Sequence, residues 1–304
     1  MLDQTYSLLL AALLAAGAAS SPTPSRSAPS RGLKHFVTFG SSTTQTGFTV
    51  NGSAPSTANP IGNPSLPGWT TSGGLNWLGF AITEFNQTTT LSYNLAVGGA
   101  TTDTTLIPTY KEGIATFVDQ VDIFYEAYVR GKTPWAWRNV LVGVWIANND
   151  VGESYARNDT QSLYPRVSAR YFEQIQRLYD VGARNFVLLT CAPQQLTPLM
   201  LEKGPESNAK LAAAVELYNK ILEDNAHKFE KSYRGSRLWL VRTSEAYEAA
   251  LDYPQAYGAP DATCTNEDGL SCLWWNTYHP GIQIHRLLGQ DVAKTMGRPW
   301  FRSP

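Results

Sequence analysis

The sequence predicts an α/β protein: a three-layer α/β/α sandwich with a central parallel sheet. Short apolar runs alternate along the chain with longer amphipathic segments, which is the pattern of strands and the helices that connect them. After residue 31, no internal repeat and no linker-like stretch interrupts this alternation. The 304 residues are enough for one large domain with a substantial hydrophobic core.

Five apolar runs are the expected strands, at residues 35–39, 91–96, 139–146, 185–190 and 237–241. Apolar residues at helical spacing predict helices at residues 75–85, 113–129, 162–181, 207–229, 243–251 and 282–296. The third of these ends beside Gly182, a typical C-terminal cap. Because crossover connections of this kind are right-handed, we expect parallel strands with helices on both faces of the sheet.

The charge balance excludes one broad class of function. The chain has 24 Lys and Arg residues against 25 Asp and Glu residues, a formal net charge of -1. It therefore lacks the basic surface of a protein that binds nucleic acid through bulk electrostatics. Charged residues make up 16% of the chain, against a usual ~25%, whereas 43% are hydrophobic. This composition also excludes global disorder.

The N-terminus has the features of a secretory signal peptide. An apolar run at residues 8–16 precedes several small residues, although Asp3 is present and no Lys or Arg comes before the run. The run is shorter than the ~20 residues that span a bilayer. We therefore expect a signal peptide at residues 1–19, a Ser/Pro-rich spacer at 20–31 and a single domain at 32–304. The mature protein is expected to be secreted and extracellular.

Sequons and cysteines agree with this expectation. Three sequons of the type that accepts N-glycans begin at Asn51, Asn86 and Asn158. Cys264 and Cys272 are eight positions apart in a loop-like stretch, which favours a disulfide worth roughly 2–3 kcal/mol in the chain-entropy model. Cys191 ends an apolar run and is expected to be a buried thiol. No Cys or His pair has metal-ligand spacing, so we expect no metal site.

The residues that follow the strands are candidates for catalysis, because ligands bind at the carboxyl ends of the strands in such sheets. Ser42 follows the first strand and is placed to act as a nucleophile, with Ser41 as its immediate rival. The Gly98-Gly99 turn after the second strand allows a backbone N–H to point into a site. Asn149, after the third strand, has a neutral NH₂ donor.

A fourth candidate, His279, is flanked by turn residues and can present its ring to a cleft. Each candidate also has a structural explanation: Ser residues cap helices, Gly-Gly forms turns, and Asn begins helices or Asx turns. Together, however, they supply the nucleophile, the base and the oxyanion donors that acyl transfer requires. Their joint occurrence favours a hydrolase.

These segments resemble the conserved blocks of the SGNH, or GDSL-type, esterase superfamily. The first block is similar to that of secreted fungal acetyl esterases of carbohydrate esterase family sixteen. The resemblance extends from about residue 34 to the last predicted helix. The stretches that carry it are residues 39–48, 67–74, 94–101, 145–152 and 278–280.

The resemblance implies a flavodoxin-like SGNH hydrolase fold that works without a cofactor. By position, Ser42 would be the nucleophile and His279 the general base. The backbone N–H groups of Ser42 and Gly99 and the side chain of Asn149 would form the oxyanion hole. The implied reaction is hydrolysis of short acyl esters, above all acetyl groups on plant-wall carbohydrate or oligosaccharides. We expect a monomer with a small-molecule or oligosaccharide substrate and with no membrane or nucleic-acid partner.

Three residues depart from the family pattern: Ser41 stands in place of Asp, Ala147 in place of Gly, and Asn276 in place of the Asp three residues before the histidine. The last departure matters most, because exchanging this carboxylate for an amide costs one serine protease about 10⁴ in turnover. Asn nevertheless orients the histidine in Cys-His-Asn enzymes, and a carbonyl of Trp274 or Trp275 could also do so. The alternatives are a weakened or inactive glycan-binding homologue and a GDSL-type lipase.

Overall fold

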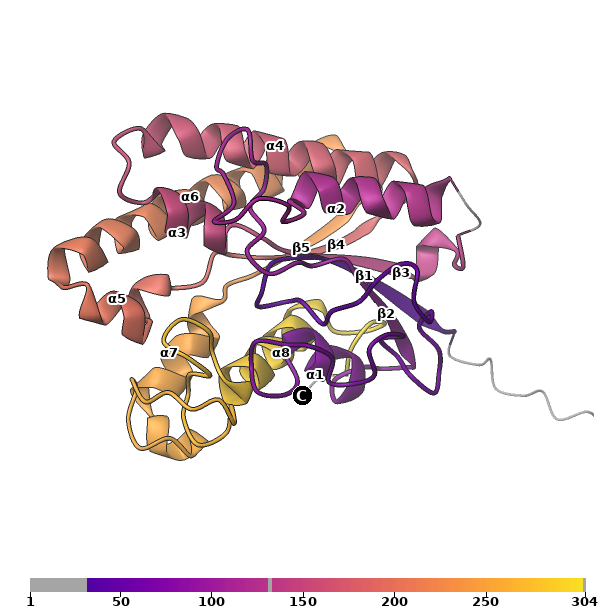
Figure 1. Cartoon of the computed structure of the whole chain (residues 1–304). Helices are drawn as coiled ribbons and strands as arrows, with labels where there is room; N and C mark the ends of the chain where they lie inside the picture. The colour runs from indigo at the N-terminus through magenta and orange to yellow at the C-terminus, as the bar shows by residue number, and fades with distance from the viewer. Residues whose placement is uncertain (1–31, 131–132, 303–304) are drawn as a thin grey trace, which may run out of the picture. The chain divides into compact units, whose positions relative to one another are not determined.

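A five-stranded, all-parallel sheet runs through the centre of the computed structural model, which describes residues 32–130 and 133–302 (Figure 1). The strands are β1 (Lys34–Gly40), β2 (Thr90–Asn94), β3 (Val140–Trp145), β4 (Asn185–Leu189) and β5 (Arg237–Val241). Their order across the sheet is β2-β1-β3-β4-β5. After β1, the chain places β2 on one side of it and then β3, β4 and β5 on the other. Ligands bind at such a switch point, here between the carboxyl ends of β1 and β3.

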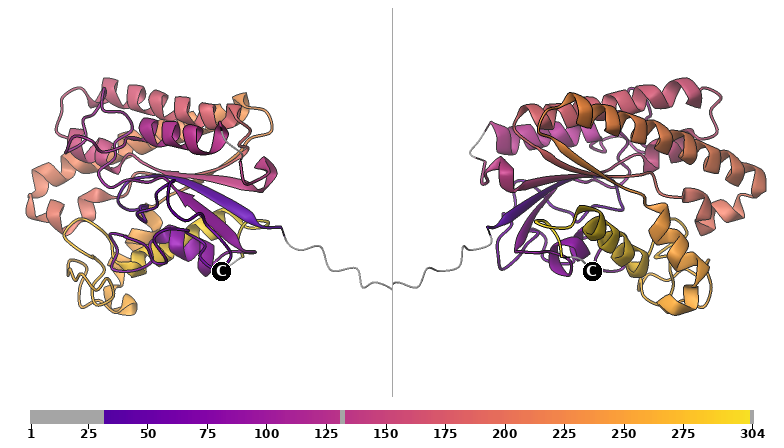
Figure 2. Two further views of the ribbon diagram at one scale, coloured as in Figure 1. Left: turned by 45° about the vertical axis from the view of Figure 1, so that its right-hand side comes forward. Right: turned by 180° about the vertical axis from the view of Figure 1, so that it is seen from behind.

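Helices cover both faces of the sheet (Figure 1, Figure 2). The α-helices are α1 (Trp77–Thr83), α2 (Phe117–Phe124), α3 (Asn148–Ser154), α4 (Thr160–Asp180), α5 (Pro198–Glu202), α6 (Pro205–Ser232), α7 (Ser244–Asp252) and α8 (Ile282–Met296). The short 3₁₀ and π turns are η1 (Tyr125–Val129), η2 (Trp137–Asn139), η3 (Gln194–Leu196) and η4 (Pro254–Tyr257). Helices α2, α4 and α6 lie on one face, and α1, α7 and α8 lie on the other. The predicted three-layer sandwich is confirmed.

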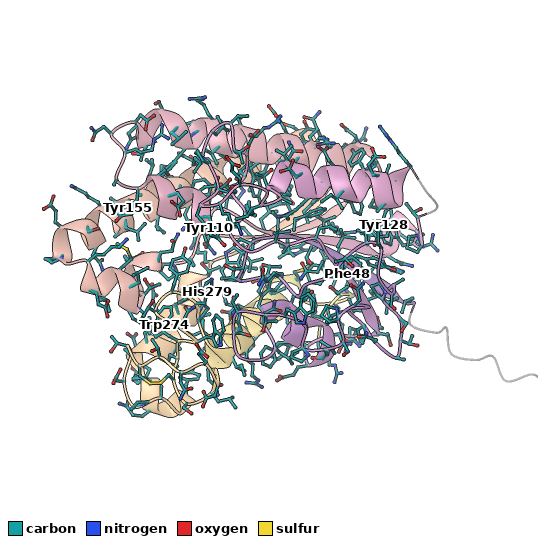
Figure 3. All side chains as sticks on the ribbon, in the orientation of Figure 1. Phe48, Tyr110, Tyr128, Tyr155, Trp274 and His279 are labelled. Atoms are coloured by element: carbon teal, nitrogen blue, oxygen red, sulfur yellow. A yellow bond between two sulfur atoms is a disulfide. The ribbon has the colours of Figure 1, made fainter. Side chains whose placement is uncertain are left out.

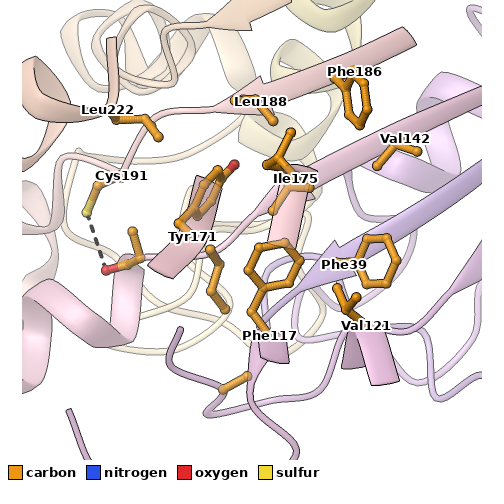
Figure 4. Close-up of a cluster of buried hydrophobic side chains, with 14 of the residues drawn as sticks. Phe39, Phe117, Val121, Val142, Tyr171, Ile175, Phe186, Leu188, Cys191 and Leu222 are labelled. Atoms are coloured by element: carbon orange, nitrogen blue, oxygen red, sulfur yellow. Dashed lines mark hydrogen bonds between the residues drawn. The ribbon is translucent and has the colours of Figure 1, made fainter. Parts of the chain in front are cut away.

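Two apolar layers hold the sandwich together, one on each face of the sheet. Successive strand residues point to opposite faces, so Phe36 packs against α1 and α8 whereas Val37 and Phe39 pack against α2 and α4. Figure 4 shows part of the second layer, where Phe117 lies between Phe39 and Tyr171. Because both of their faces are buried, the central strands β3 and β4 are almost continuously apolar, whereas the edge strand β2 alternates polar and apolar residues.

Most predicted elements lie within a few residues of the observed ones, and the strand at 237–241 and the helix at 282–296 match. The helix expected at 113–129 begins later, at Phe117, because Thr116 and Asp119 form a capping box at its N-terminus. It also ends earlier, as a π turn from Tyr125. Helices α3 and α5 were not predicted, since each is short and α3, unlike the equally short α1, is mostly polar.

The expected signal peptide (1–19) and spacer (20–31) lie outside the described residues, so they and the proposed division of the chain stay predictions. From Gly32 onward the chain forms one compact unit. In the part that the structure describes, no helix is both long and apolar enough to cross a membrane.

The predicted disulfide between Cys264 and Cys272 is present, and Cys191 is a buried free thiol that lies close to the Ala147 carbonyl (Figure 4). The sequon residues Asn51 and Asn158 are exposed. Asn86 is only partly exposed, and its Nδ2 donates to the Thr88 carbonyl (3.1 Å). Glycosylation stays a prediction, for which Asn51 and Asn158 are the better acceptors.

His285 is a fully buried residue that joins α8 to α1. Its Nδ1 accepts a hydrogen bond from the backbone N–H of Trp77 (3.2 Å). Burial and, to a smaller extent, the nearby His279 lower the pKa of His285 to about 3. Protonation would also place a second donor against the Trp77 N–H. The folded protein therefore holds this imidazole neutral.

This pKa predicts a specific dependence of stability on pH. Below pH ~6.5 the unfolded chain binds a proton at His285 that the folded protein does not bind, so stability falls as the pH falls. The variant His285→Asn keeps an acceptor for the Trp77 N–H but has no group that titrates at this position. As the pH falls, we expect its free energy of unfolding to decrease less steeply than that of the wild type, by up to about 1.4 kcal/mol per pH unit. Urea unfolding of both proteins at pH 7.5, 6 and 5 tests this. Parallel pH dependences would contradict it.

Candidate active site

Ser42 and His279, which are far apart in the sequence, meet at the carboxyl edge of the sheet. His279 Nε2 lies 2.8 Å from Ser42 Oγ. Ser42 follows β1, and His279 lies in the loop that leads into α8. A hydroxyl within hydrogen-bonding distance of an imidazole nitrogen is the arrangement of an activated nucleophile.

The turn that carries Ser42 is held by buried polar side chains. Gln120 exchanges two hydrogen bonds with the backbone of Gly40, each 2.9 Å long. The Thr44 carbonyl accepts hydrogen bonds from Nδ2 of Asn94 (2.7 Å) and of Asn76 (2.9 Å). These contacts satisfy backbone groups that the turn removes from the sheet, and they fix the position of the nucleophile.

Ser41, the rival nucleophile, is not placed for catalysis. Its side chain is buried, and in the described part of the chain its Oγ has no hydrogen-bond partner. Its carbonyl accepts hydrogen bonds from the N–H groups of Thr44 and Gln45 (both 3.0 Å), which closes the turn. Of the two serines, Ser42 is the one that faces His279.

Asn276 orients the histidine. Its Oδ1 lies 3.2 Å from His279 Nδ1 and also accepts hydrogen bonds from the backbone N–H groups of Tyr278 (2.9 Å) and His279 (2.7 Å). These two backbone donors require the amide oxygen, not the NH₂ group, to face the ring. Nδ1 therefore carries the proton, and Nε2 is free to accept the proton of Ser42.

Two nearby groups that could take this role, the Trp274 carbonyl and the Asp268 carboxylate, are engaged elsewhere. The Trp274 carbonyl accepts a hydrogen bond from Asn266 N (2.9 Å), and the Trp274 side chain is fully buried in the core. The Asp268 carboxylate accepts from the backbone N–H groups of Leu270 (2.8 Å) and Ser271 (2.9 Å). Within residues 32–130 and 133–302, Asn276 Oδ1 is the one hydrogen-bond partner of His279 Nδ1.

Burial controls the basicity of the histidine. Removal of the ring from water lowers the pKa of His279 to about 4. The neutral amide of Asn276 supplies no negative charge that would raise it again. The imidazole is therefore in the neutral, proton-accepting form from mildly acidic pH upward.

The oxyanion-hole candidates line the same cleft. Asn149 is the second residue of α3, and its Nδ2 donates one hydrogen to the Ala100 carbonyl (2.8 Å), which leaves its other hydrogen for a ligand. The N–H groups of Ser42 and Gly99 donate to no acceptor in the described residues. Gly99, Asn149 and Ser42 line one cleft. They can stabilise an oxyanion that forms when Ser42 attacks a carbonyl.

Asp150 holds the glycine turn in place, a role that the sequence did not predict. Its fully buried carboxylate accepts hydrogen bonds from Thr102 N (2.9 and 3.1 Å) and Thr102 Oγ1 (3.2 Å). Burial raises the pKa of Asp150 to about 6, although the bonds from Thr102 act in the opposite direction. Two consecutive residues of α3, Asn149 and Asp150, thus anchor the segment that contains Gly99.

Ala147, which replaces the family glycine, adopts a backbone conformation that normally favours glycine. Its φ is +98°, in the left-handed region, at the point where the chain leaves β3 and begins α3. This conformation costs a non-glycine residue roughly 1–2 kcal/mol. Alanine in place of glycine at position 147 therefore lowers the stability of the fold, but Asn149 still lines the cleft.

Gln194 makes a second connection within the site that the sequence did not predict. Tyr278 OH donates to Gln194 Oε1 (2.8 Å), and Gln194 Nε2 donates to the Asn148 carbonyl (2.8 Å). Gln194 therefore connects the loop of His279 to the helix of Asn149. Gln194 follows the fourth strand in the same way as the predicted site residues follow the first three, and this position is the signal that could have identified it.

The catalytic pair opens into a large cleft of about 680 Å³. Gln45, Thr71 and Tyr110 line one part of it, and Leu199 and Met200, both from α5, line another. Figure 3 shows His279, Tyr110 and Tyr155, all of which line the cleft, at the same end of the molecule. Among the residues that the structure describes, no cluster of three His, Cys, Asp or Glu side chains could hold a metal.

Known proteins resemble the chain in sequence and in fold. Residues 36–292 match the family described as GDSL-like Lipase/Acylhydrolase. The chain is 50% identical to an acetylesterase of Thermothelomyces thermophilus over 293 residues, which are 95% of this chain and 97% of that protein. It is 24% identical to the thermolabile hemolysin of Vibrio parahaemolyticus over 226 residues, covering 67% of this chain and 51% of the hemolysin. The solved structure of an acetylxylan esterase from Geobacillus stearothermophilus is similar in fold, with a TM-score of 0.51 and 15% identity, covering 89% of this chain and 97% of the other.

These similarities extend over nearly the whole described domain and include every segment that contributes to the cleft. They agree with the contact between Ser42 and His279 and with the donors that surround it. The chain belongs to the GDSL-like lipase/acylhydrolase family and is a carboxylic ester hydrolase.

Proposed function

We propose that the protein is a secreted acetylesterase that removes acetyl groups from plant-wall carbohydrate or oligosaccharides. The observation that carries this proposal is the 50% identity to an acetylesterase over 97% of that protein's length. In the proposed reaction, Ser42 Oγ attacks the ester carbonyl while His279 Nε2 accepts its proton. As the ester C–O bond breaks, the imidazolium protonates the leaving sugar oxygen, which departs as a hydroxyl, and water then releases acetate from the acyl-enzyme by the same steps.

Secretion is part of the proposal and has its own support. A disulfide such as Cys264–Cys272 persists in oxidising compartments, and the sequon residues Asn51 and Asn158 are exposed. The signal peptide expected at residues 1–19 is the third argument. Determination of the N-terminus and the glycan content of protein recovered outside the cell would test it.

The alternative of an inactive glycan-binding homologue has less support. Its main argument was Asn276, but the amide oxygen faces the ring and leaves His279 in the tautomer that can accept a proton. A specific feature does favour a second candidate, a GDSL-type lipase: Leu199, Met200 and Leu211 give the far part of the cleft an apolar lining. Such a lining would suit a longer acyl chain.

Acyl-chain length and the nature of the alcohol separate these candidates. We expect release of acetate from acetylated xylo-oligosaccharides, together with kcat/KM for p-nitrophenyl acetate that exceeds the value for the decanoate at least about tenfold, or ~1.4 kcal/mol of barrier. Ser42→Ala is the control for contaminating esterases. A preference for decanoate would support the lipase, and an absence of turnover on every ester would support the binding protein.

A further inference from the structure

One strongly exposed aromatic side chain lines the cleft, and a second belongs to a segment that contributes to the cleft wall. Among the described residues, three aromatic side chains are about 70% exposed: Trp69 and Tyr110 (both 71%) and Tyr253 (69%). Tyr110 lines the cleft directly, and Trp69 is two residues before Thr71, which also lines it. An exposed aromatic ring contributes little to the core, and where it lines a cleft it is available to pack against a ligand.

Both rings are held in place by a glycine. Gly99 has φ +80° and Gly47 has φ +77°, a backbone conformation that favours glycine. A Cβ at Gly99 would lie 2.8 Å from Cδ1 of Tyr110, and a Cβ at Gly47 would lie 2.6 Å from Cε3 of Trp69. Each ring therefore packs directly on the backbone on one side, which restricts its motion while the rest of the ring remains exposed.

The amide of Gln45 also lines the cleft. Its Oε1 packs close to the backbone of Gly98, where it would lie 2.6 Å from a Cβ. Gln45 is also next to Thr46, whose carbonyl accepts a hydrogen bond from Trp69 N (2.9 Å). Tyr110 thus shares the lining of the cleft with an amide that has both donor and acceptor groups, and Trp69 is hydrogen-bonded through its backbone to the residue that follows this amide.

We propose that Tyr110 and Gln45 form a binding subsite for a pyranose ring of the alcohol part of the substrate, and that Trp69 extends it to a neighbouring sugar. The apolar C–H face of a pyranose packs on an aromatic ring, and its hydroxyls bind an amide. The cleft, at about 680 Å³, is much larger than an acetyl ester requires, so its remaining volume is available for the sugar. This inference rests on the proposed function and specifies how the carbohydrate binds.

The test compares substrates with and without a sugar. We expect Tyr110→Ala to raise KM for an acetylated xylo-oligosaccharide roughly three- to tenfold, with a smaller effect from Trp69→Ala, because aromatic packing is worth ~0.5–1.5 kcal/mol. Ethyl acetate has no sugar ring to pack on Tyr110, so its turnover by Tyr110→Ala should stay within about twofold of the wild-type value, a difference of ~0.4 kcal/mol. Tyr110→Phe keeps the ring and should restore the KM. Tyr253→Ala is the matched control, since this tyrosine is equally exposed but does not line the cleft.

Each outcome has a distinct meaning. Equal losses on both substrates would overturn the subsite, because Tyr110 would then act by supporting Gly99. An unchanged KM for the oligosaccharide in Tyr110→Ala would also overturn it. If the wild-type enzyme hydrolyses ethyl acetate but releases no acetate from any acetylated sugar, the proposed function fails instead.

Discussion

Replacement of Ser42 by alanine is expected to lower kcat/KM for an acetyl ester by about 10⁴-fold or more, because nucleophile deletions in serine hydrolases have effects of this size. Ser42 is the hydroxyl that lies 2.8 Å from His279 Nε2, and no other hydroxyl has a hydrogen bond to this ring in the described residues. The measurement is initial-rate hydrolysis of p-nitrophenyl acetate by the purified variant and the wild type.

Ser41→Ala is the matched control for this variant. Its hydroxyl is buried without a partner, so its removal leaves no hydrogen-bonding group unsatisfied. Ser41→Ala should therefore keep most of the activity and the thermal stability of the wild type. Comparable losses in the two variants, or activity that persists in a folded Ser42→Ala protein, would contradict the assignment of Ser42.

The sequence predicted those parts of the site that follow from sheet topology. In a parallel sheet the ends of β1, β2 and β3 lie at one edge, so Ser42, Gly99 and Asn149 could be placed together from their positions after the strands. His279 follows no strand, and periodicity alone does not bring it to Ser42. The family resemblance supplied that connection, and the structure shows the contact between the two side chains.

The parts that could not be predicted depend on side-chain orientation and on long-range packing. Nothing local to Asp150 indicates that its carboxylate binds Thr102, which is 48 residues away. Likewise, no local pattern indicates that the Tyr110 ring packs on the backbone of Gly99. Helix α3 is short and mostly polar, so the element that positions Asn149 was not predicted although the residue was.

The orientation of the Asn276 amide is another such feature, and it determines how this substitution affects the enzyme. In the serine protease in which an amide replaces the acid, the loss of about 10⁴ arises largely from the wrong histidine tautomer. Here the backbone N–H groups of Tyr278 and His279 hold the amide oxygen toward the ring, so the correct tautomer is preserved. What Asn276 lacks is the negative charge that stabilises the imidazolium formed during proton transfer.

Asn276→Asp is therefore expected to raise turnover of an acetyl ester at about pH 8 ten- to a hundredfold, where each ~1.4 kcal/mol of barrier is tenfold. The gain should be smaller than 10⁴ because the tautomer is already correct and only the charge is restored. The carboxylate should also raise the pKa of His279 from its value of about 4, because an opposite charge favours the imidazolium. The acidic limb of kcat/KM, which reports the free enzyme, should thus move to higher pH while the plateau rises. Thr277→Asp, which adds the same charge at the neighbouring exposed position, is the control and should change neither quantity. If a well-folded Asn276→Asp enzyme shows an unchanged or lower plateau, the missing charge does not limit catalysis, and the neutral amide of Asn276 is as effective an orienting group as the carboxylate.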